Sequence, residues 1–212
     1  MLTLAETYED MLKKGEIQED RFMKVSDLAR ASIVISVSAM DGYFTRKFGE
    51  TLIPFLKKKG PTKGIVKVLE KAGFDITEAI RLLNMHRPFR RIRSLVEGYL
   101  DRVVAQKFAV IDELFLCFGY KDFTHNVQKR THRKRMLRTI EILIERRHDI
   151  VHDGDVDSMG RLKPLSIKQT RKRLKELARF VWYSERIINR QMKKLNPKNK
   201  LTAEQPHQPD AD

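Results

Sequence analysis

Cysteine is almost absent from this sequence, since Cys117 is the only one in 212 residues. A disulfide framework within the chain is therefore excluded, and a metal site built from thiolates is nearly excluded. This scarcity favours a reducing, intracellular setting, and we expect a cytoplasmic protein.

The sequence also lacks a long hydrophobic run. No stretch approaches the roughly eighteen uncharged apolar residues that a membrane-spanning helix needs. Residues 1–20 mix acidic side chains into their first turns and so do not resemble a basic, then apolar, signal region. We expect a protein that does not associate with a membrane.

Acidic residues are fewer than basic residues. Lys and Arg number 43 and Asp and Glu 28, so the formal net charge is +15. The excess lies in residues 121–200, which hold 23 basic and 9 acidic residues. RNA is a natural partner for such a segment, because neutralising phosphates releases counterions whatever the base sequence. A solvated helical face that keeps the protein soluble explains a charge run equally well. The candidate RNA-binding residues are Lys129, Arg130, Arg133, Lys134, Arg135 and Arg138.

Alternation of period two, which marks half-buried strands, is not found, and apolar residues recur at helical spacing instead. We therefore predict an all-α fold. The predicted helices cover about 4–14, 26–49, 52–56, 65–72, 75–106, 108–118, 123–152 and 166–194, the fifth being kinked or divided at Pro88. The expected apolar set of the second helix is Leu28, Ile35, Ala39 and Phe48. Length and apolar content fit one domain over 1–195, and the Pro-rich polar tail 196–212 is expected to be disordered.

Ionisable side chains crowd into residues 145–154, where the helix predicted over 123–152 should stop at Asp153-Gly154. An apolar stripe that includes Met136, Ile140 and Leu143 precedes them and is expected to pin this helix to the core. So many ionisable groups at one helix end indicate a functional site or local ion pairs.

Arg147 and His152 are separated by four residues, with the polar His148 directly after the arginine and Ile150-Val151 before the histidine. This pattern resembles the Arg-x4-6-His signature of the HEPN superfamily. The runs RRHDIVHDGD and SIVISVSAMDGYF most resemble its RiboL-PSP-HEPN group, in which Asp41 would match an acidic residue. The resemblance covers the early, motif and last helices and leaves 57–121 outside. It implies an up-and-down helical bundle of HEPN type with an additional helical segment in the middle.

The resemblance implies a metal-independent endoribonuclease that needs no cofactor. Arg147 and His152 would be catalytic, supported by Arg146, His148, Asp149 and Asp41. A histidine can accept or donate a proton near neutral pH, and an arginine offers a planar fork to two phosphate oxygens. RNA carries its own nucleophile, the 2′-hydroxyl, so a 2′,3′-cyclic phosphate is the expected first product. A toxin with a cognate antitoxin protein, a phage-defence effector and an RNA-processing enzyme are the biological roles left open.

A spacing of five residues puts Arg147 and His152 about 140° apart around an ideal helix. Either the helix loosens near His152, or the site combines residues of two chains. HEPN motifs commonly meet across a dimer of helix bundles, so the resemblance favours the second arrangement. We expect a homodimer.

Two metal sites compete with this interpretation. His148 and His152 stand at i and i+4, as in zinc hydrolases, but Asp149 is shorter than the usual Glu and no clear third ligand follows. The run from Asp153 starts like a calcium loop, but Ser158 and Pro164 occupy its sixth and twelfth positions, which effectively excludes it.

The main alternative is a non-catalytic basic helical module that binds RNA, a nucleotide or a partner protein. Arg147 and His152 would then form local ion pairs with Asp149, Asp153 or Asp41.

Overall fold

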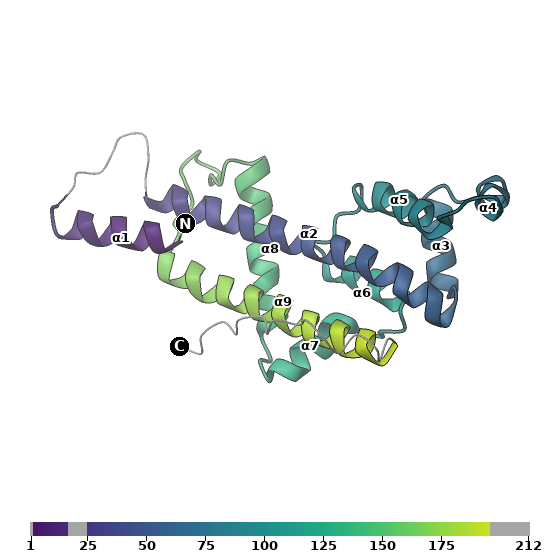
Figure 1. The fold of residues 1–212 in the computed structure, drawn as a ribbon. Helices are drawn as coiled ribbons and strands as arrows, with labels where there is room; N and C mark the ends of the chain where they lie inside the picture. The colour runs from purple at the N-terminus through teal and green to yellow at the C-terminus, as the bar shows by residue number, and fades with distance from the viewer. Residues whose placement is uncertain (1, 17–24, 196–212) are drawn as a thin grey trace.

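A computed structural model describes residues 2–16 and 25–195 of the chain, and in these ranges the regular structure is helical (Figure 1). The helices are α1 (Leu2–Lys13), α2 (Val25–Lys59), α3 (Lys63–Lys71), α4 (Ile76–Leu83), α5 (Pro88–Leu100), α6 (Phe108–Leu116), α7 (Phe123–Thr131), α8 (Met136–His152) and α9 (Ile167–Leu195). An isolated bridge between Val156 and Leu162 is the sole β-type pairing seen in these ranges. The predicted all-α class is confirmed. No helix of the described residues is long and apolar enough to cross a membrane.

Helix α2 is the central element, and it is longer than predicted. We expected a break near Gly49 and a separate piece over 52–56, but the helix continues through Pro54 to Lys59. The reason is tertiary: Phe48, Leu52 and Phe55 are buried, so packing outweighs the hydrogen bond that the proline removes.

The predicted apolar set of α2 was only partly correct. Phe48 is buried, but Leu28 is half-buried and Ile35 and Ala39 are exposed. The buried face is instead formed at three- and four-residue spacing by Ala29, Ile33, Val37, Met40, Phe44 and Phe48. The presence of a helix here was predicted correctly, but its length and the side that is buried were not.

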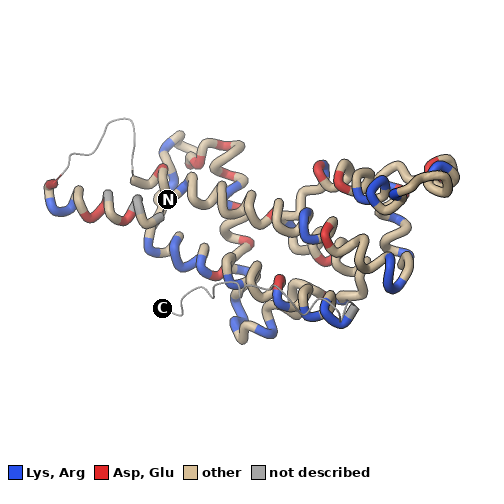
Figure 2. Tube along the Cα trace, viewed as in Figure 1, with Lys and Arg blue, Asp and Glu red and all other residues tan. Residues whose placement is uncertain are grey.

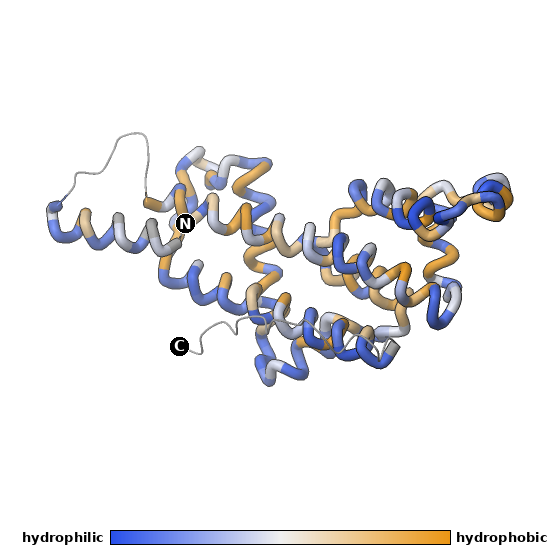
Figure 3. The backbone as a smooth tube through the Cα atoms, in the orientation of Figure 1, coloured by the Kyte–Doolittle hydropathy of each residue, from blue (hydrophilic) through white to orange (hydrophobic). Residues whose placement is uncertain are grey.

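One hydrophobic core joins α2, α8 and α9, which pack against one another, to the middle of the chain. Phe44 lies at its centre and makes ring contacts with Phe115, Phe123 and Phe180. Segment 57–121, for which the sequence indicated no role, supplies α3 to α6, and α6 adds Phe115 to this core. Figure 3 shows hydrophobic positions concentrated along α6 and on parts of α2 and α8, whereas hydrophilic positions prevail along α7 and α9.

Two predicted helices are divided. Pro88 occupies the first turn of α5, where its missing N–H costs nothing, and the chain breaks before it. The helix predicted over 123–152 is interrupted between α7 and α8, where His132 adopts a φ of 55°. Side chains stabilise this break: Thr131 Oγ1 accepts from the backbone N–H of Arg133, and Gln128 Oε1 accepts from that of Leu137. The tail predicted to be disordered, 196–212, lies outside the described residues.

Candidate active site

Helix α8 carries the candidate motif at its C-terminal end. Met136, Ile140 and Leu143 are buried, so the predicted apolar stripe does fix the helix to the core. The helix remains regular through His152 and is capped at Asp153, with Gly154 at a φ of 65°. The predicted stop at Asp153-Gly154 is confirmed, but the loosening considered near His152 does not occur. Arg147 and His152 therefore point about 140° apart within one chain.

Arg147 has no ion pair with a carboxylate of the described residues. Its side chain is half-buried, and its Nε atom is buried without a hydrogen-bond partner there. A buried donor that lacks an acceptor is costly, on the order of 1–3 kcal/mol. Of the three acids that the non-catalytic alternative offered as partners, Asp149 pairs with Lys163 instead, Asp41 binds a distant loop, and the exposed Asp153 forms no ion pair with Arg147. Arg147 is thus a cation available to an external anion.

His148 and His152 lie side by side on the exposed face of α8. Their ring centroids are 4.5 Å apart and the rings are tilted by 40°. Both side chains are exposed, so both imidazoles are accessible to a substrate. The two rings would be the start of a metal site, but no group of three His, Cys, Asp or Glu side chains placed to hold a metal ion occurs within residues 2–16 and 25–195.

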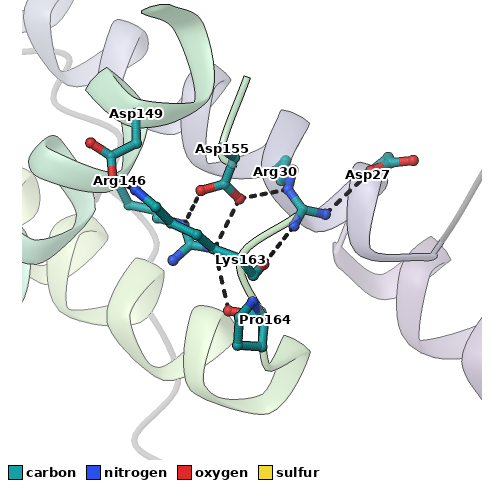
Figure 4. Close-up of polar contacts among 7 residues, drawn as sticks. All are labelled: Asp27, Arg30, Arg146, Asp149, Asp155, Lys163 and Pro164. Carbon is teal, nitrogen blue, oxygen red and sulfur yellow. Dashed lines mark hydrogen bonds and ion pairs between the residues drawn. The ribbon is translucent and has the colours of Figure 1, made fainter. Parts of the chain in front are cut away.

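Arg146, the immediate neighbour of Arg147, belongs to a charge cluster around the buried Asp155, which we call the Asp155 cluster (Figure 4). It consists of Asp27, Arg30, Arg146 and Asp155. The Asp155 side chain is 0% exposed. Its Oδ1 lies 2.8 Å from Arg146 Nε, and its Oδ2 accepts from Arg30 Nε at 2.6 Å and from Arg146 at 2.8 Å. Arg146 was predicted to support the site, and its contacts make that support structural.

The same two arginines hold the loop that follows the motif. Arg30 and Arg146 both donate to the carbonyl oxygen of Lys163, at 2.8 and 3.1 Å. Arg30 also pairs with Asp27 near the start of α2. The backbone of Asp155 donates to the carbonyl of Asp149 and accepts from Lys163. The Asp155 cluster thereby ties the end of α8 to α2 and to the segment that leads into α9.

Asp149, a second predicted supporting residue, accepts from Lys163 Nζ at 2.6 Å. This hydrogen bond holds the pKa of the Asp149 carboxyl below its ordinary value, so the group is an anion at neutral pH. It orders the loop and leaves the proton-transfer role to the histidines.

Asp41, the third acidic candidate, lies elsewhere. Its carboxylate accepts from the backbone N–H of Ala105 at 2.6 Å and from Gln106 Nε2 at 3.0 Å. The residue therefore anchors the connection between α5 and α6, and the structure does not bring it to Arg147 or His152.

The predicted RNA-binding residues differ in their surroundings. Arg133 pairs with Glu176, and Arg138 lies 3.5 and 3.6 Å from Glu141 and Glu145. The others, Lys129, Arg130, Lys134 and Arg135, are exposed around the α7–α8 turn and pair with no carboxylate of the described residues.

Sequence reasoning missed Asp155 and Arg30. Asp155 was considered only within a calcium loop, and Arg30 lies in an apolar stretch 125 residues away, so no local pattern could connect them. It also missed the basic side of α9, where Arg186 and Arg190 face α7. Comparison with known proteins finds no match to a protein-family model, to a curated protein or to a solved structure.

Proposed function

We propose that this protein is a metal-independent endoribonuclease, in which Arg147 binds the scissile phosphate and His152 transfers protons. The observation that carries the proposal is the unpaired, half-buried Arg147 in the same helical turns as two exposed imidazoles. Arg146, directly before it in the sequence, is by contrast held by Asp155. An arginine left without an acceptor is suited to a ligand that brings its own negative charge.

The chemistry follows from these side chains. The 2′-hydroxyl of RNA attacks the adjacent phosphorus while the bond to the 5′-oxygen breaks, which leaves a 2′,3′-cyclic phosphate and a free 5′-hydroxyl. An imidazole accepts the 2′ proton, and an imidazolium returns one to the departing oxygen. Arg147 stabilises the charge that develops on the phosphorane oxygens. His148, whose ring lies against that of His152, is placed to share in the proton transfers.

The proposed site requires two copies of the chain. Because α8 is regular through His152, Arg147 and His152 of one chain diverge. A two-fold axis beside α8 would bring Arg147 of one protomer to His152 of the other. Val151, four residues after Arg147, is 47% exposed, as expected of an apolar residue in such an interface.

Cleavage of a labelled single-stranded RNA in the presence of EDTA tests the activity. We expect the intact protein to cleave it, and Arg147→Ala and His152→Ala to abolish cleavage. His125→Ala, which changes another exposed histidine in α7, is the matched control and should leave the rate unchanged. Cleavage that EDTA removes, or that survives both substitutions, would contradict the proposal.

Mixing the two inactive variants tests the shared site. In a mixed dimer one of the two sites regains an intact Arg147 and an intact His152. Random exchange should then restore about a quarter of the original activity. No recovery, in subunits shown by mass to have exchanged, would place the whole site in one chain.

Binding of RNA without any cleavage would support the non-catalytic module instead. The observation that favours this second candidate is the set of exposed, unpaired basic residues around the α7–α8 turn.

A further inference from the structure

The basic residues of α7 and α9 enclose a groove that lies away from the candidate active site. One hollow of about 710 Å³ and a second of about 570 Å³ share Lys129, Arg130 and Arg190 in their walls, so they form one continuous depression. We call it the α7–α9 groove. Its basic residues are Lys59, Lys129, Arg130, Arg186, Arg190 and Lys194.

Among the described residues, no acidic side chain lines either hollow. Figure 2 shows the same accumulation of Lys and Arg along α7 and α9. Like charges crowded together repel one another, and each raises the local potential that an anion experiences. A depression with this lining is therefore suited to a ligand that carries several negative charges along its length.

The groove has an aromatic and apolar wall as well as a basic one. Tyr120 and Ile187, both half-buried, line the first hollow together with the core residue Phe123, and the half-buried Tyr183 lines the second. Beside them, Arg186 lies over the ring of Trp182, 4.5 Å from its centroid. Proteins that bind single-stranded nucleic acid combine such basic tracks with aromatic surfaces on which bases stack. The bases of a duplex are paired and stacked inside it, so a duplex would contact only the basic residues of the groove and not its aromatic residues.

We propose that the α7–α9 groove is a docking site for single-stranded RNA, separate from the site of cleavage. Helix α7, which lines the groove, lies next to the N-terminal end of α8 (Figure 1), whereas His152 is the last residue of α8. The 17 residues of α8 span about 25 Å at the usual rise per residue. A strand that occupies both places in one protomer needs about seven nucleotides at a stacked spacing of about 3.4 Å. The requirement for length rests on the proposed ribonuclease activity, whereas binding in the groove does not.

Binding is tested with the full chain carrying His152→Ala, which prevents cleavage, and a labelled 12-nucleotide single-stranded RNA. Replacing Arg186 and Arg190 by Glu should weaken binding at least ten-fold. It should also lower the slope of log affinity against log salt by about 0.7 for each phosphate that the variant no longer neutralises. If the charge reversal disturbs folding, Arg190→Gln with Lys129→Gln is the milder variant to use. It should also weaken RNA binding.

Arg90→Glu with Arg93→Glu is the matched control. Both arginines are exposed on α5, which packs on α2, α3 and α4 and not on α7 or α9, and the change in net charge is the same. This variant should keep nearly all the affinity. An equal loss in the two variants would show that total charge alone governs binding, and no loss in either would also overturn the proposal. Equal affinity for a duplex, or groove-dependent binding of an acidic peptide but not of RNA, would overturn the assignment to single-stranded RNA.

Cleavage assays separate this proposal from the previous one. With His152 intact, the groove variant should cleave a 12-nucleotide RNA several-fold more slowly and a four-nucleotide RNA at the unchanged rate. If cleavage depends on His152 but not on the groove at either length, the docking site is refuted and the ribonuclease stands. If the groove binds RNA and nothing is cleaved, the ribonuclease is refuted and the docking site stands.

Discussion

Replacing Asp155 by Asn should strongly destabilise this protein, because it removes the negative charge that lies between two largely buried guanidinium groups. The Asp155 side chain is 0% exposed, and those of Arg30 and Arg146 are 9% and 20% exposed. Breaking a buried ion pair by removing one partner typically costs about 3–5 kcal/mol. Asn has nearly the same shape and tolerates a positive φ, which is 59° at this position, so the substitution isolates the charge.

Urea denaturation followed by circular dichroism measures this cost, and the melting temperature should fall by about 10 °C for a chain of this size. Asp157→Asn is the matched control in the same loop. Asp157 pairs with Arg161, whose side chain is 70% exposed, and such exposed pairs contribute under about 1 kcal/mol. Its Oδ1 also accepts from the backbone N–H groups of Met159 and Arg161, and the amide oxygen of Asn can keep both hydrogen bonds. If Asp155→Asn cost no more than Asp157→Asn, the Asp155 cluster would not stabilise the fold as argued.

Two other stability predictions concern different parts of the molecule. Burial raises the pKa of the Glu185 carboxyl, but the Lys47 ammonium and the Tyr43 hydroxyl outweigh it and leave the pKa below its ordinary value. The ionised Glu185 carboxylate therefore stabilises the fold at any pH above its pKa in the unfolded chain, about 4.3. This stabilisation is lost as the pH falls through the lower pKa of the folded protein. The melting temperature should therefore be level from pH 7 to 5 and decrease below about pH 4. In Lys47→Met the decrease should be less steep. An equal decrease in both proteins would contradict a stabilising contact between Lys47 and Glu185. Gly64→Ala should cost about 1–3 kcal/mol in urea denaturation, because a Cβ there meets Cys117 Sγ at 3.0 Å and Cα at 3.2 Å, whereas Gly98→Ala, which meets nothing within 4 Å, should not destabilise the protein.

Local signals predicted the helices well, and tertiary contacts account for the errors. Gly15, Gly73 and Gly119 adopt positive φ values where helical segments were predicted to stop. Ser166 caps α9, whose predicted range begins at this residue. By contrast, the continuation of α2 through Pro54 depends on buried partners from elsewhere in the chain. Sequence periodicity identifies a helix more readily than the side of it that is buried, and Ile35, predicted as core, is 55% exposed.

The candidate site shows the same division between local and tertiary information. The motif, its helix end and the crowding of charge were all visible in the sequence. What could not be predicted is which groups are already paired, because the partner of Arg146 and Arg30 is a loop aspartate that no periodicity marks. Asp41 illustrates the converse, since the acidic residue that the resemblance selected binds the α5–α6 connection instead.

Arg146 and Arg147 are identical in type and adjacent in sequence, yet they differ in what they contact. Successive residues on a helix point about 100° apart, so Arg146 meets Asp155 while Arg147 meets no carboxylate of the described residues. Arg146→Lys should lower the free energy of unfolding by about 1.5–3 kcal/mol, because the single nitrogen of Lys cannot take the places of both Nε and Nη2, which together reach Asp155 and the Lys163 carbonyl. Arg147→Lys should not destabilise the fold, because the buried Nε donor that it removes has no acceptor among the described residues. It should still lower the RNA cleavage rate, since the planar fork for phosphate is lost. Urea denaturation and cleavage assays on both variants measure the contrast. If Arg147→Lys destabilised the fold as much as Arg146→Lys, Arg147 would be structural, and the argument for a catalytic arginine would lose its basis.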